Sequence, residues 1–244
     1  MESTIINSKV IKELEYKNRI DIKNLYIGKD VEEIGAEAFS LCHNLESIEV
    51  DDNNKRFGSF NSNCIVDLKT GALILGCKNT VIPNSVSLIA PFAFCGQINL
   101  ESIRIPSNIT KVCSYAFDGC LNAKTLVIDE GLVEINENAF RGCLSLEVIK
   151  IPSTINKIEK FAFGYSREYC LSKLFDTNGK SINYQLSDLE KGPLNIKEIH
   201  FNLEKSCVMK ICDFNELFCV NLITQSHDLL IICKDRTIIF EKIN

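Results

Sequence analysis

The chain has 244 residues, 45% of them hydrophobic, and a formal net charge of −5. A chain of this length and composition can bury a large core. The acidic balance provides no basic field of the kind that attracts nucleic acid or anionic lipid, so neither partner is expected. No stretch is long and apolar enough to span a bilayer, so membrane insertion is not expected.

The N-terminal segment, residues 1–24, is predicted to cap the first unit of the fold. Apolar residues recur there with a weak amphipathic spacing, at Ile6, Val10, Ile11 and Leu14. The segment is rich in Lys and Glu and lacks the apolar core, roughly seven residues or longer, of a secretory signal. On sequence alone the chain is therefore expected in the cytoplasm.

Residues 25–165 contain five copies of the block I-x-x-I-x-x-x-A-F with identical internal spacing. Four of its Ala-Phe pairs, at Ala93-Phe94, Ala116-Phe117, Ala139-Phe140 and Ala162-Phe163, follow a strict step of 23 residues, and Ala38-Phe39 precedes them. A unit this short cannot bury its own apolar face and must stack on its neighbours. We therefore predict one elongated domain over residues 1–244, with the Phe rings stacked into a continuous spine.

A second block, C-x-x-L-x-x-I-x-I, follows each Phe and predicts a short strand. It is clearest at Cys42 to Val50 and at Cys143 to Ile151. Its apolar residues alternate with polar ones, which indicates a strand with one buried and one exposed face. Pro, Gly or Asp after each strand predicts a turn. The Ala-Phe block has helical or loosely turning spacing and is expected to form the back wall.

Together the two blocks resemble the BspA-type leucine-rich repeat family, which occurs on surface proteins of bacteria and parasitic protists. The resemblance covers roughly residues 25–165. It implies an α/β repeat solenoid, a right-handed coil with short parallel strands on one face. It also implies exposure at a cell surface or secretion, in contrast to the cytoplasmic expectation above.

Residues 51–79 interrupt the repeat. Between Ile48 and Thr80 the step is 32 residues instead of 23, and the Ala-Phe block is missing. Apolar runs at Cys64–Leu68 and Ala72–Gly76 are joined by a short loop that ends in Gly71, where a positive φ is available. We therefore predict an inserted β-hairpin.

Residues 166–244 are predicted to hold irregular repeats and a β-rich C-terminal cap, because a solenoid needs a cover over its last coil. A polar stretch from Asp176 to Gly192 breaks the period. The strand pattern returns once, at Ile196, Ile199 and Phe201. Leu229–Cys233 and Thr237–Glu241 then predict a second hairpin.

The chain has 12 cysteines, which could indicate a disulfide scaffold. Cys42, Cys120 and Cys143, however, share one repeat position, where a small buried side chain is needed. Reduced thiols fill such a position well. We therefore predict stacked free thiols, with a disulfide between neighbouring coils as the alternative.

No catalytic, cofactor or metal site is predicted. Cys207, Cys212, Cys219 and Cys233 with His200 and His227 are the nearest approach to a zinc site, but their spacing does not match zinc motifs and their neighbours are apolar, which favours buried capping cysteines. His43 is expected in an exposed loop. Asp51 and Asp52 are expected to support a turn. An enzyme would need a site hidden in irregular segments, so none is expected.

The exposed positions of the strands predict a contact strip with two rows. We define this contact strip as Tyr26, Glu49, Val81, Arg104, Val127 and Lys150, with Ser47, Ser102 and Thr125 from the neighbouring row. Such a mixture of aromatic, β-branched and charged residues suits a protein contact, although it also suits a solvated sheet without a partner. We expect a monomeric, non-catalytic scaffold that binds a protein or glycan, with adhesion as one use. The alternative is a structural spacer in a larger assembly.

Overall fold

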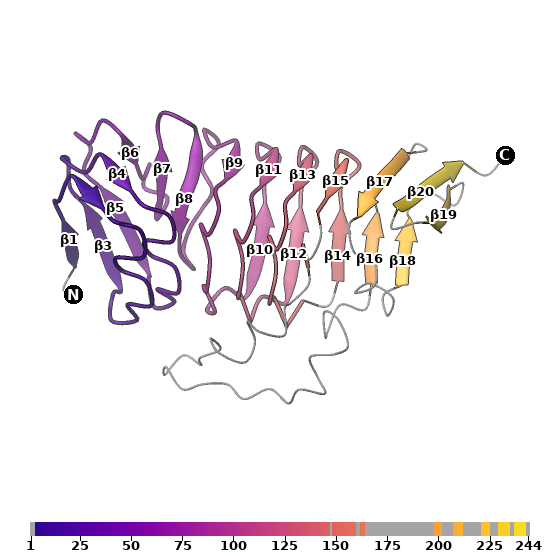
Figure 1. The fold of residues 1–244 in the computed structure, drawn as a ribbon, viewed down its shortest axis with the longest axis horizontal. Helices are drawn as coiled ribbons and strands as arrows, with labels where there is room; N and C mark the ends of the chain where they lie inside the picture. Colours follow the sequence, from indigo (N-terminus) through magenta and orange to yellow (C-terminus); the bar gives the residue numbers. More distant parts are fainter. Residues whose placement is uncertain are drawn as a thin grey trace.

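The protein is a β-solenoid of short strands stacked along one axis (Figure 1). The computed structural model describes residues 3–146, 148–159 and 162–163, together with strands at 198–201, 207–211, 221–224, 229–234 and 237–242. These residues contain no helix. The helical part of the predicted α/β class is therefore corrected, whereas stacked coils with short parallel strands are observed.

The Ala-Phe blocks at residues 38–39, 93–94, 116–117 and 139–140 form turns because each is flanked by two residues in the left-handed backbone region. In one block Glu37 has a φ of 54° and Leu41 a φ of 65°. In another, Tyr115 has a φ of 61° and Gly119 a φ of 72°. An α-helix requires a φ near about −63° at every residue, so a helix cannot continue through either position. Apolar spacing alone did not reveal this.

The strands of the C-x-x-L-x-x-I-x-I blocks form two parallel sheets along one side of the solenoid (Figure 1). The first sheet has the order β1-β3-β5, made of Thr4–Ile6, Asn24–Ile27 and Ser47–Val50. The second has the order β10-β12-β14-β16-β18, made of Ser102–Ile105, Thr125–Ile128, Val148–Ile151, Glu198–Phe201 and Asn221–Thr224. Because β1 pairs in parallel with β3, the N-terminal segment forms a coil like those that follow.

The I-x-x-I blocks form a second row of shorter parallel strands. At the N-terminal end β2 (Val10–Ile11) pairs with β4 (Glu33–Ile34) in a separate two-stranded sheet. Farther along, β9, β11, β13, β15 and β17 pair in this order, and they comprise Leu88–Ile89, Lys111–Val112, Glu134–Ile135, Lys157–Ile158 and Cys207–Ile211. Both rows are therefore interrupted between the second coil and β9.

The insert causes this interruption, and its predicted hairpin is confirmed. Strands β7 (Cys64–Asp67) and β8 (Ala72–Gly76) pair antiparallel, Gly71 has the expected positive φ of 68°, and β6 (Phe57–Gly58) adds a third strand. Strand β8 pairs in parallel with β9. The hairpin thus extends the longer sheet and is not a surface appendage.

The hairpin also divides the interior into two hydrophobic clusters. Cys64, Val66 and Leu73 pack with the cluster of the later coils, whereas Ile65 and Leu75 pack with the cluster of the N-terminal coils. All four residues of β7 are buried. Alternate side chains of a strand point to opposite faces, so the hairpin serves as a shared wall between the two clusters.

The aromatic spine exists, but in two pieces. Tyr16 stacks on Phe39 with ring centroids 5.3 Å apart. Four rings form the second piece, Phe94, Phe117, Phe140 and Phe163, at 4.7, 5.2 and 5.4 Å. A Cβ placed on Gly76 would lie 2.1 Å from the Phe94 ring. The backbone of β8 therefore covers the ring face that the preceding Phe would otherwise occupy.

The C-terminal hairpin is confirmed as well. Strand β19 (Leu229–Lys234) pairs antiparallel with β20 (Thr237–Lys242), and β20 pairs with β17. The return of the repeat is confirmed by β16, which pairs in parallel with β14, but β18 pairs in parallel with β16, so the strand returns twice instead of the predicted once. Cys212, Cys219 and His227, and the side chains of His200, Cys207 and Cys233, lie outside the described residues, as does the polar stretch 176–192.

Candidate interaction cleft at the interrupted coil

The predicted contact strip is divided between the two strand sheets. Tyr26, Ser47 and Glu49 lie on β3 and β5, whereas Ser102, Arg104, Thr125 and Val127 lie on β10 and β12. Within each sheet the predicted rows are correct, since Tyr26 pairs with Glu49, Ser102 with Thr125 and Arg104 with Val127. Lys150 belongs to β14, and its side chain lies outside the described residues.

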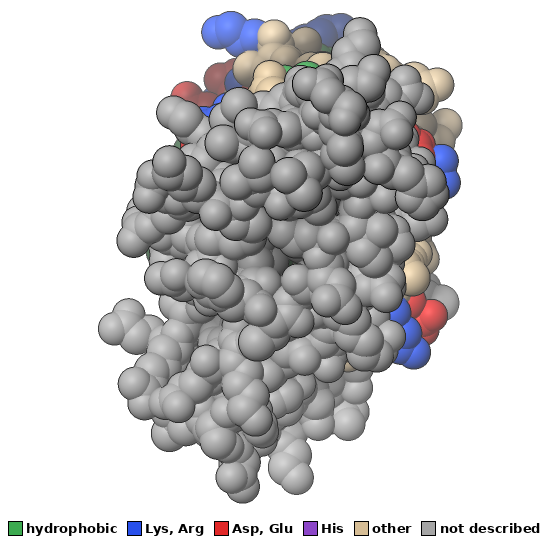
Figure 2. All heavy atoms as spheres, turned by 90° about the vertical axis from the view of Figure 1, so that its right-hand side faces the viewer, with side chains coloured by type: hydrophobic (Ala, Val, Ile, Leu, Met, Phe, Trp, Pro, Cys, Tyr) green, Lys and Arg blue, Asp and Glu red, His purple; other side chains and the backbone are tan. Residues whose placement is uncertain are grey.

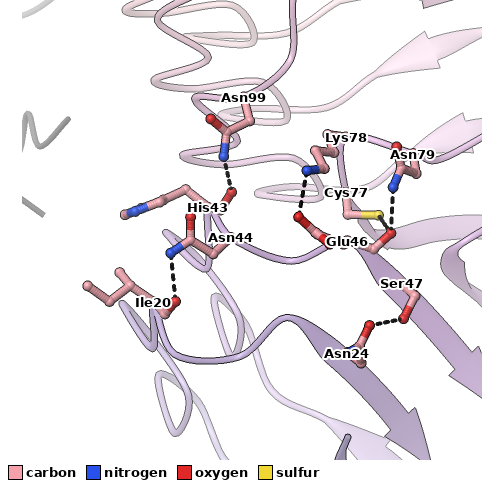
Figure 3. Close-up of polar contacts among 10 residues, drawn as sticks. All are labelled: Ile20, Asn24, His43, Asn44, Glu46, Ser47, Cys77, Lys78, Asn79 and Asn99. Atoms are coloured by element: carbon pink, nitrogen blue, oxygen red, sulfur yellow. Dashed lines mark hydrogen bonds and ion pairs between the residues drawn. The ribbon is translucent and has the colours of Figure 1, made fainter. Parts of the chain in front are cut away.

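Val81 does not continue the strip, contrary to the prediction. Residues 79–82 form no strand, and the Val81 side chain is 72% exposed. Figure 3 shows what replaces that strand: Lys78 forms an ion pair with Glu46 at 2.7 Å, and the Asn79 side chain donates to the Glu46 carbonyl at 2.9 Å. The chain turns against the loop before β5, which leaves the strip without a link between its two halves.

Polar members of the strip already bond within the protein. Ser47 donates its hydroxyl proton to Asn24 at 2.7 Å (Figure 3), and Tyr26 donates to Asp51 at 2.9 Å. Asp51 also accepts the Asn53 backbone N–H, and both bonds lower the pKa of Asp51, with the backbone bond contributing most. The turn role predicted for Asp51 is confirmed. Arg104 binds both oxygens of Asp129 at 3.0 and 2.8 Å.

The repeat cysteines are free, buried and bonded to the backbone of the preceding coil. Cys120 and Cys143 donate to the carbonyls of Phe94 and Phe117, each at 3.3 Å, and Cys42 donates to the carbonyl of Tyr16 at 3.1 Å. Burial raises the pKa of Cys42 to about 11. The Cys42 thiol is therefore a poor nucleophile, because the thiolate is the reactive form.

His43 is buried, contrary to the expectation of an exposed loop. The residue is only 4% exposed, and its backbone carbonyl accepts a hydrogen bond from the Asn99 side chain at 2.8 Å (Figure 3). Nearby, the Leu41 N–H donates to the Cys95 carbonyl at 3.0 Å. The turn of the second coil thus stacks directly on the turn that follows Phe94, because the interrupted coil contributes no Ala-Phe turn between them.

A cleft of about 800 Å³ opens beside this contact. We call it the junction cleft. Residues 10–13 and 32–40 line one wall, and Arg56, Phe57, Asp67, Ile74, Leu75 and residues 90–92 line the other. One wall therefore comes from the N-terminal coils and the other from the insert and the coil after it. The interrupted repeat is the reason that the walls do not meet.

The junction cleft combines an apolar floor with unsatisfied polar atoms. Arg56 Nη2 binds Asp67 at 2.7 Å, but Arg56 Nη1 is buried without a hydrogen-bond partner among the described residues. The Ser40 hydroxyl, on a residue 3% exposed, also has no such partner. Buried polar atoms are normally paired, but neither atom is open to solvent, so neither is offered to an occupant of the cleft in this conformation.

A smaller cavity of about 290 Å³ shares Glu37 and Phe92 with the junction cleft. It is walled by ion pairs. Arg141 binds both oxygens of Asp118 at 2.9 and 2.7 Å, and its guanidinium lies 4.7 Å from the centre of the Tyr115 ring. Because these charged groups are already partnered within the protein, we assign this cavity a structural role.

The charges around the junction cleft are mainly acidic. Among its lining residues, the carboxylates are Glu13, Glu32, Glu33, Glu37 and Asp67, and the cations are Lys12 and Arg56. Elsewhere on the surface positive and negative side chains are mixed, as Figure 2 shows at the rim of the molecule seen from the β18–β20 end.

The described residues contain no cluster of three or more His, Cys, Asp or Glu side chains that could hold a metal ion. The described part also contains no helix with the length and apolar character needed to cross a membrane.

These features define a leucine-rich repeat solenoid interrupted by a structural insert. The family model described as the BspA type leucine rich repeat region matches residues 4–70 and 74–186 in six copies. The chain therefore belongs to the BspA-type leucine-rich repeat family.

Solved structures that resemble this fold include two bacterial proteins. A leucine rich cell surface protein from Faecalibacterium prausnitzii A2-165 has 18% identity and a TM-score of 0.58, over 93% of this chain and 60% of that one. The pneumococcal vaccine antigen PcpA has 16% identity and a TM-score of 0.56, over 90% of this chain and 55% of that one. The chain thus spans less than two thirds of either protein. No curated protein matches it.

Sequence reasoning missed the junction cleft, although one signal pointed to it. The nine extra residues and the missing Ala-Phe block both fall in one coil. A coil without its back-wall turn cannot fill the space between its neighbours, so a cavity at that position could have been expected. Which side chains line the cavity depends on how the hairpin packs, and the pattern alone does not specify this.

Proposed function

We propose that this protein is a non-catalytic binding scaffold that contacts a protein or glycan ligand through the junction cleft. The observation that carries the proposal is the cleft itself, about 800 Å³ in volume, which combines apolar side chains with several carboxylates in its lining. Ligand sites are typically concave and largely apolar, with a few convergent polar groups. One of the structural relatives is described as a cell surface protein, which supports a role in adhesion at a cell surface.

The contact strip is the second candidate surface under this proposal. It is divided between two sheets, and its best-placed cation, Arg104, already binds Asp129. A ligand on the strip would have to compete with that ion pair or span the gap at Val81. The cleft imposes neither requirement, which is why we favour it. The competing function is a spacer that only separates parts of an assembly.

The test places a large side chain in the cleft. Ala36 lines the cleft and is exposed, so Ala36→Trp should obstruct it without disturbing the core. Ser114 occupies the same repeat position in an uninterrupted coil, which makes Ser114→Trp the matched control. Binding of the native chain and both variants to a glycan array and to purified extracellular proteins would be measured, with thermal melts to verify folding.

We expect Ala36→Trp to weaken binding at least about tenfold, since a ligand cannot share the cleft with an indole. Ser114→Trp should bind like the native chain. Equal binding by all three would exclude the cleft, and a parallel Arg104→Glu variant would then test the strip. A native chain that binds no ligand in either panel would favour the spacer.

A further inference from the structure

The uninterrupted coils show what each I-x-x-I strand provides for the next. Strands β11, β13 and β15 align Lys111 with Glu134 and Glu134 with Lys157. Glu134 forms ion pairs with Lys111 at 3.0 Å and with Lys157 at 2.7 Å. These bonds, led by that from Lys157, lower the pKa of Glu134. Each strand thus pairs charge with opposite charge across the ladder.

Strand β4 has the same chemistry but no following strand. Glu33 occupies the repeat position of Glu134, yet it forms no ion pair with any described residue. Ile34 is only half-buried, whereas its equivalents Ile89, Val112 and Ile135 are fully buried. The missing neighbour therefore leaves both a charge and an apolar side chain without the partners that they have elsewhere.

The backbone edge of β4 is open in the same way. The Ile135 carbonyl accepts the N–H of Glu159 at 2.9 Å, and the Val133 carbonyl accepts that of Lys157 at 3.3 Å. The equivalent carbonyls, of Ile34 and Glu32, accept no hydrogen bond from the described residues. Residues 32–40 line the junction cleft, so this edge faces the cleft.

The insert closes the other strand edge of the same coil. The Ile48 N–H donates to Asn63 and the Val50 N–H to Ser59, each at 3.4 Å, so side chains of the insert cover the edge of β5. No such cover is present on β4 among the described residues. Open strand edges are normally protected, because they pair readily with other chains. The selective exposure of β4 inside a concave cleft is what a binding edge requires.

We propose that the junction cleft takes an extended peptide of a partner protein, which pairs in parallel with β4 and places a Lys opposite Glu33 and an aliphatic residue opposite Ile34. The inference rests on the proposed function of the cleft and names its ligand class. Strand addition obtains affinity from backbone bonds and specificity from alternate side chains. The peptide N–H groups would donate to the Glu32 and Ile34 carbonyls, which accept no other hydrogen bond from the described residues.

The test uses a capped synthetic peptide with the sequence of residues 153–159, which contains the strand pattern that pairs with Glu134 in this chain. It would be titrated into the full-length chain and followed through backbone amide NMR signals. We expect shifts at Ile34 and Gly35. Glu33→Lys should weaken binding at least about fivefold, since like charges directly opposite each other destabilise a strand pair. A peptide with Lys157→Glu should recover the loss in the Glu33→Lys variant.

Glu13→Lys is the matched control, because it makes the same charge change in the cleft lining but follows β2, which pairs with the opposite edge of β4. Equal effects of Glu13→Lys and Glu33→Lys, absence of recovery, or shifts outside the cleft would overturn the proposal. If the native chain forms dimers that Glu33→Lys dissociates, the β4 edge binds a second copy of the chain, and the proposal is overturned as well. If the peptide does not bind, while Ala36→Trp abolishes binding of another ligand, then strand pairing is wrong and the proposed binding function stands.

Discussion

The uninterrupted coils and the interrupted coil use one repeat with different outcomes. In the described part of residues 109–163, β11, β13 and β15 pair in register with one another, and Phe117, Phe140 and Phe163 stack in sequence. At the insert, β8 replaces one coil, the rings lose their stack at Gly76 and a cleft opens. The comparison shows that regular stacking provides stability, whereas an irregular coil provides a concave surface. Five predictions test this division of roles.

The largest effect is expected for Phe117→Ala, in the middle of the long ring stack. Phe117 is 2% exposed and stacks on Phe94 and Phe140. Removing a buried Phe should lower the free energy of unfolding by about 3–5 kcal/mol. Phe39 stacks on Tyr16 alone, so Phe39→Ala should lower the free energy of unfolding by about 0.5–1.5 kcal/mol less than Phe117→Ala does, because one ring pair fewer is removed. Urea unfolding of both variants measures the difference, and equal losses would contradict the role of stacking.

A nearly equal effect is expected for Asp118→Ala in the uninterrupted region. Asp118 and Arg141 form an ion pair whose side chains are only 2% and 11% exposed. Removing the carboxylate leaves a buried guanidinium without its counter-charge, which should cost about 3 kcal/mol. The double variant Asp118→Ala, Arg141→Met should recover part of this loss in urea unfolding. No recovery would show that the pair acts through packing instead of charge.

A moderate effect is expected for Gly96→Ala, where the second coil meets the coil after the insert. Gly96 has a φ of 74°, and an added Cβ would lie 2.8 Å from the Leu41 Cα. We expect a loss of about 2–3 kcal/mol from backbone strain and overpacking. Gly71 is the control, since its φ is 68° but its nearest neighbour lies 3.8 Å away. Gly71→Ala should cost only about 1 kcal/mol, and thermal melts would compare the two.

A smaller effect should appear at alkaline pH. Burial raises the pKa of Cys42 from an ordinary value of 9.0 to about 11. Between pH 9 and 11 the unfolded chain loses this proton while the folded chain keeps it, so stability falls as pH rises through that window. In Cys42→Ala this contribution to the pH dependence of stability is absent. Urea denaturation midpoints of both proteins at pH 8, 9 and 10 would show the difference, and an identical fall of the midpoint with pH in both would contradict the assignment.

The smallest effect is expected on the contact strip. The Arg104 and Asp129 side chains are 68% and 29% exposed, so solvent screens their ion pair. Arg104→Ala should change the free energy of unfolding by no more than about 0.5 kcal/mol. Urea unfolding beside Asp118→Ala gives a direct contrast between an exposed and a buried pair. A large loss would mean that the strip stabilises the fold.

The amino-acid sequence by itself determined the coil. The 23-residue step, the alternation at Ile103 and Ile105 and the Ala-Phe pairs specify which side chains face inward, because stacking buries equivalent positions together. The hairpin at Cys64–Gly76 was equally predictable, since alternation and Gly71 are local signals. The back wall was not, because the left-handed φ at Glu37 or Tyr115 leaves no mark in hydrophobic spacing.

Only the tertiary structure decided where a ligand could bind. Whether Val81 continues the strip, whether His43 is buried and which strand edge the insert covers all depend on contacts between residues far apart in the chain. The repeat pattern describes a coil and its neighbour, but the insert replaces that neighbour once. At that position the hairpin packs against both hydrophobic clusters at the same time, and the space beside β4 follows from this packing.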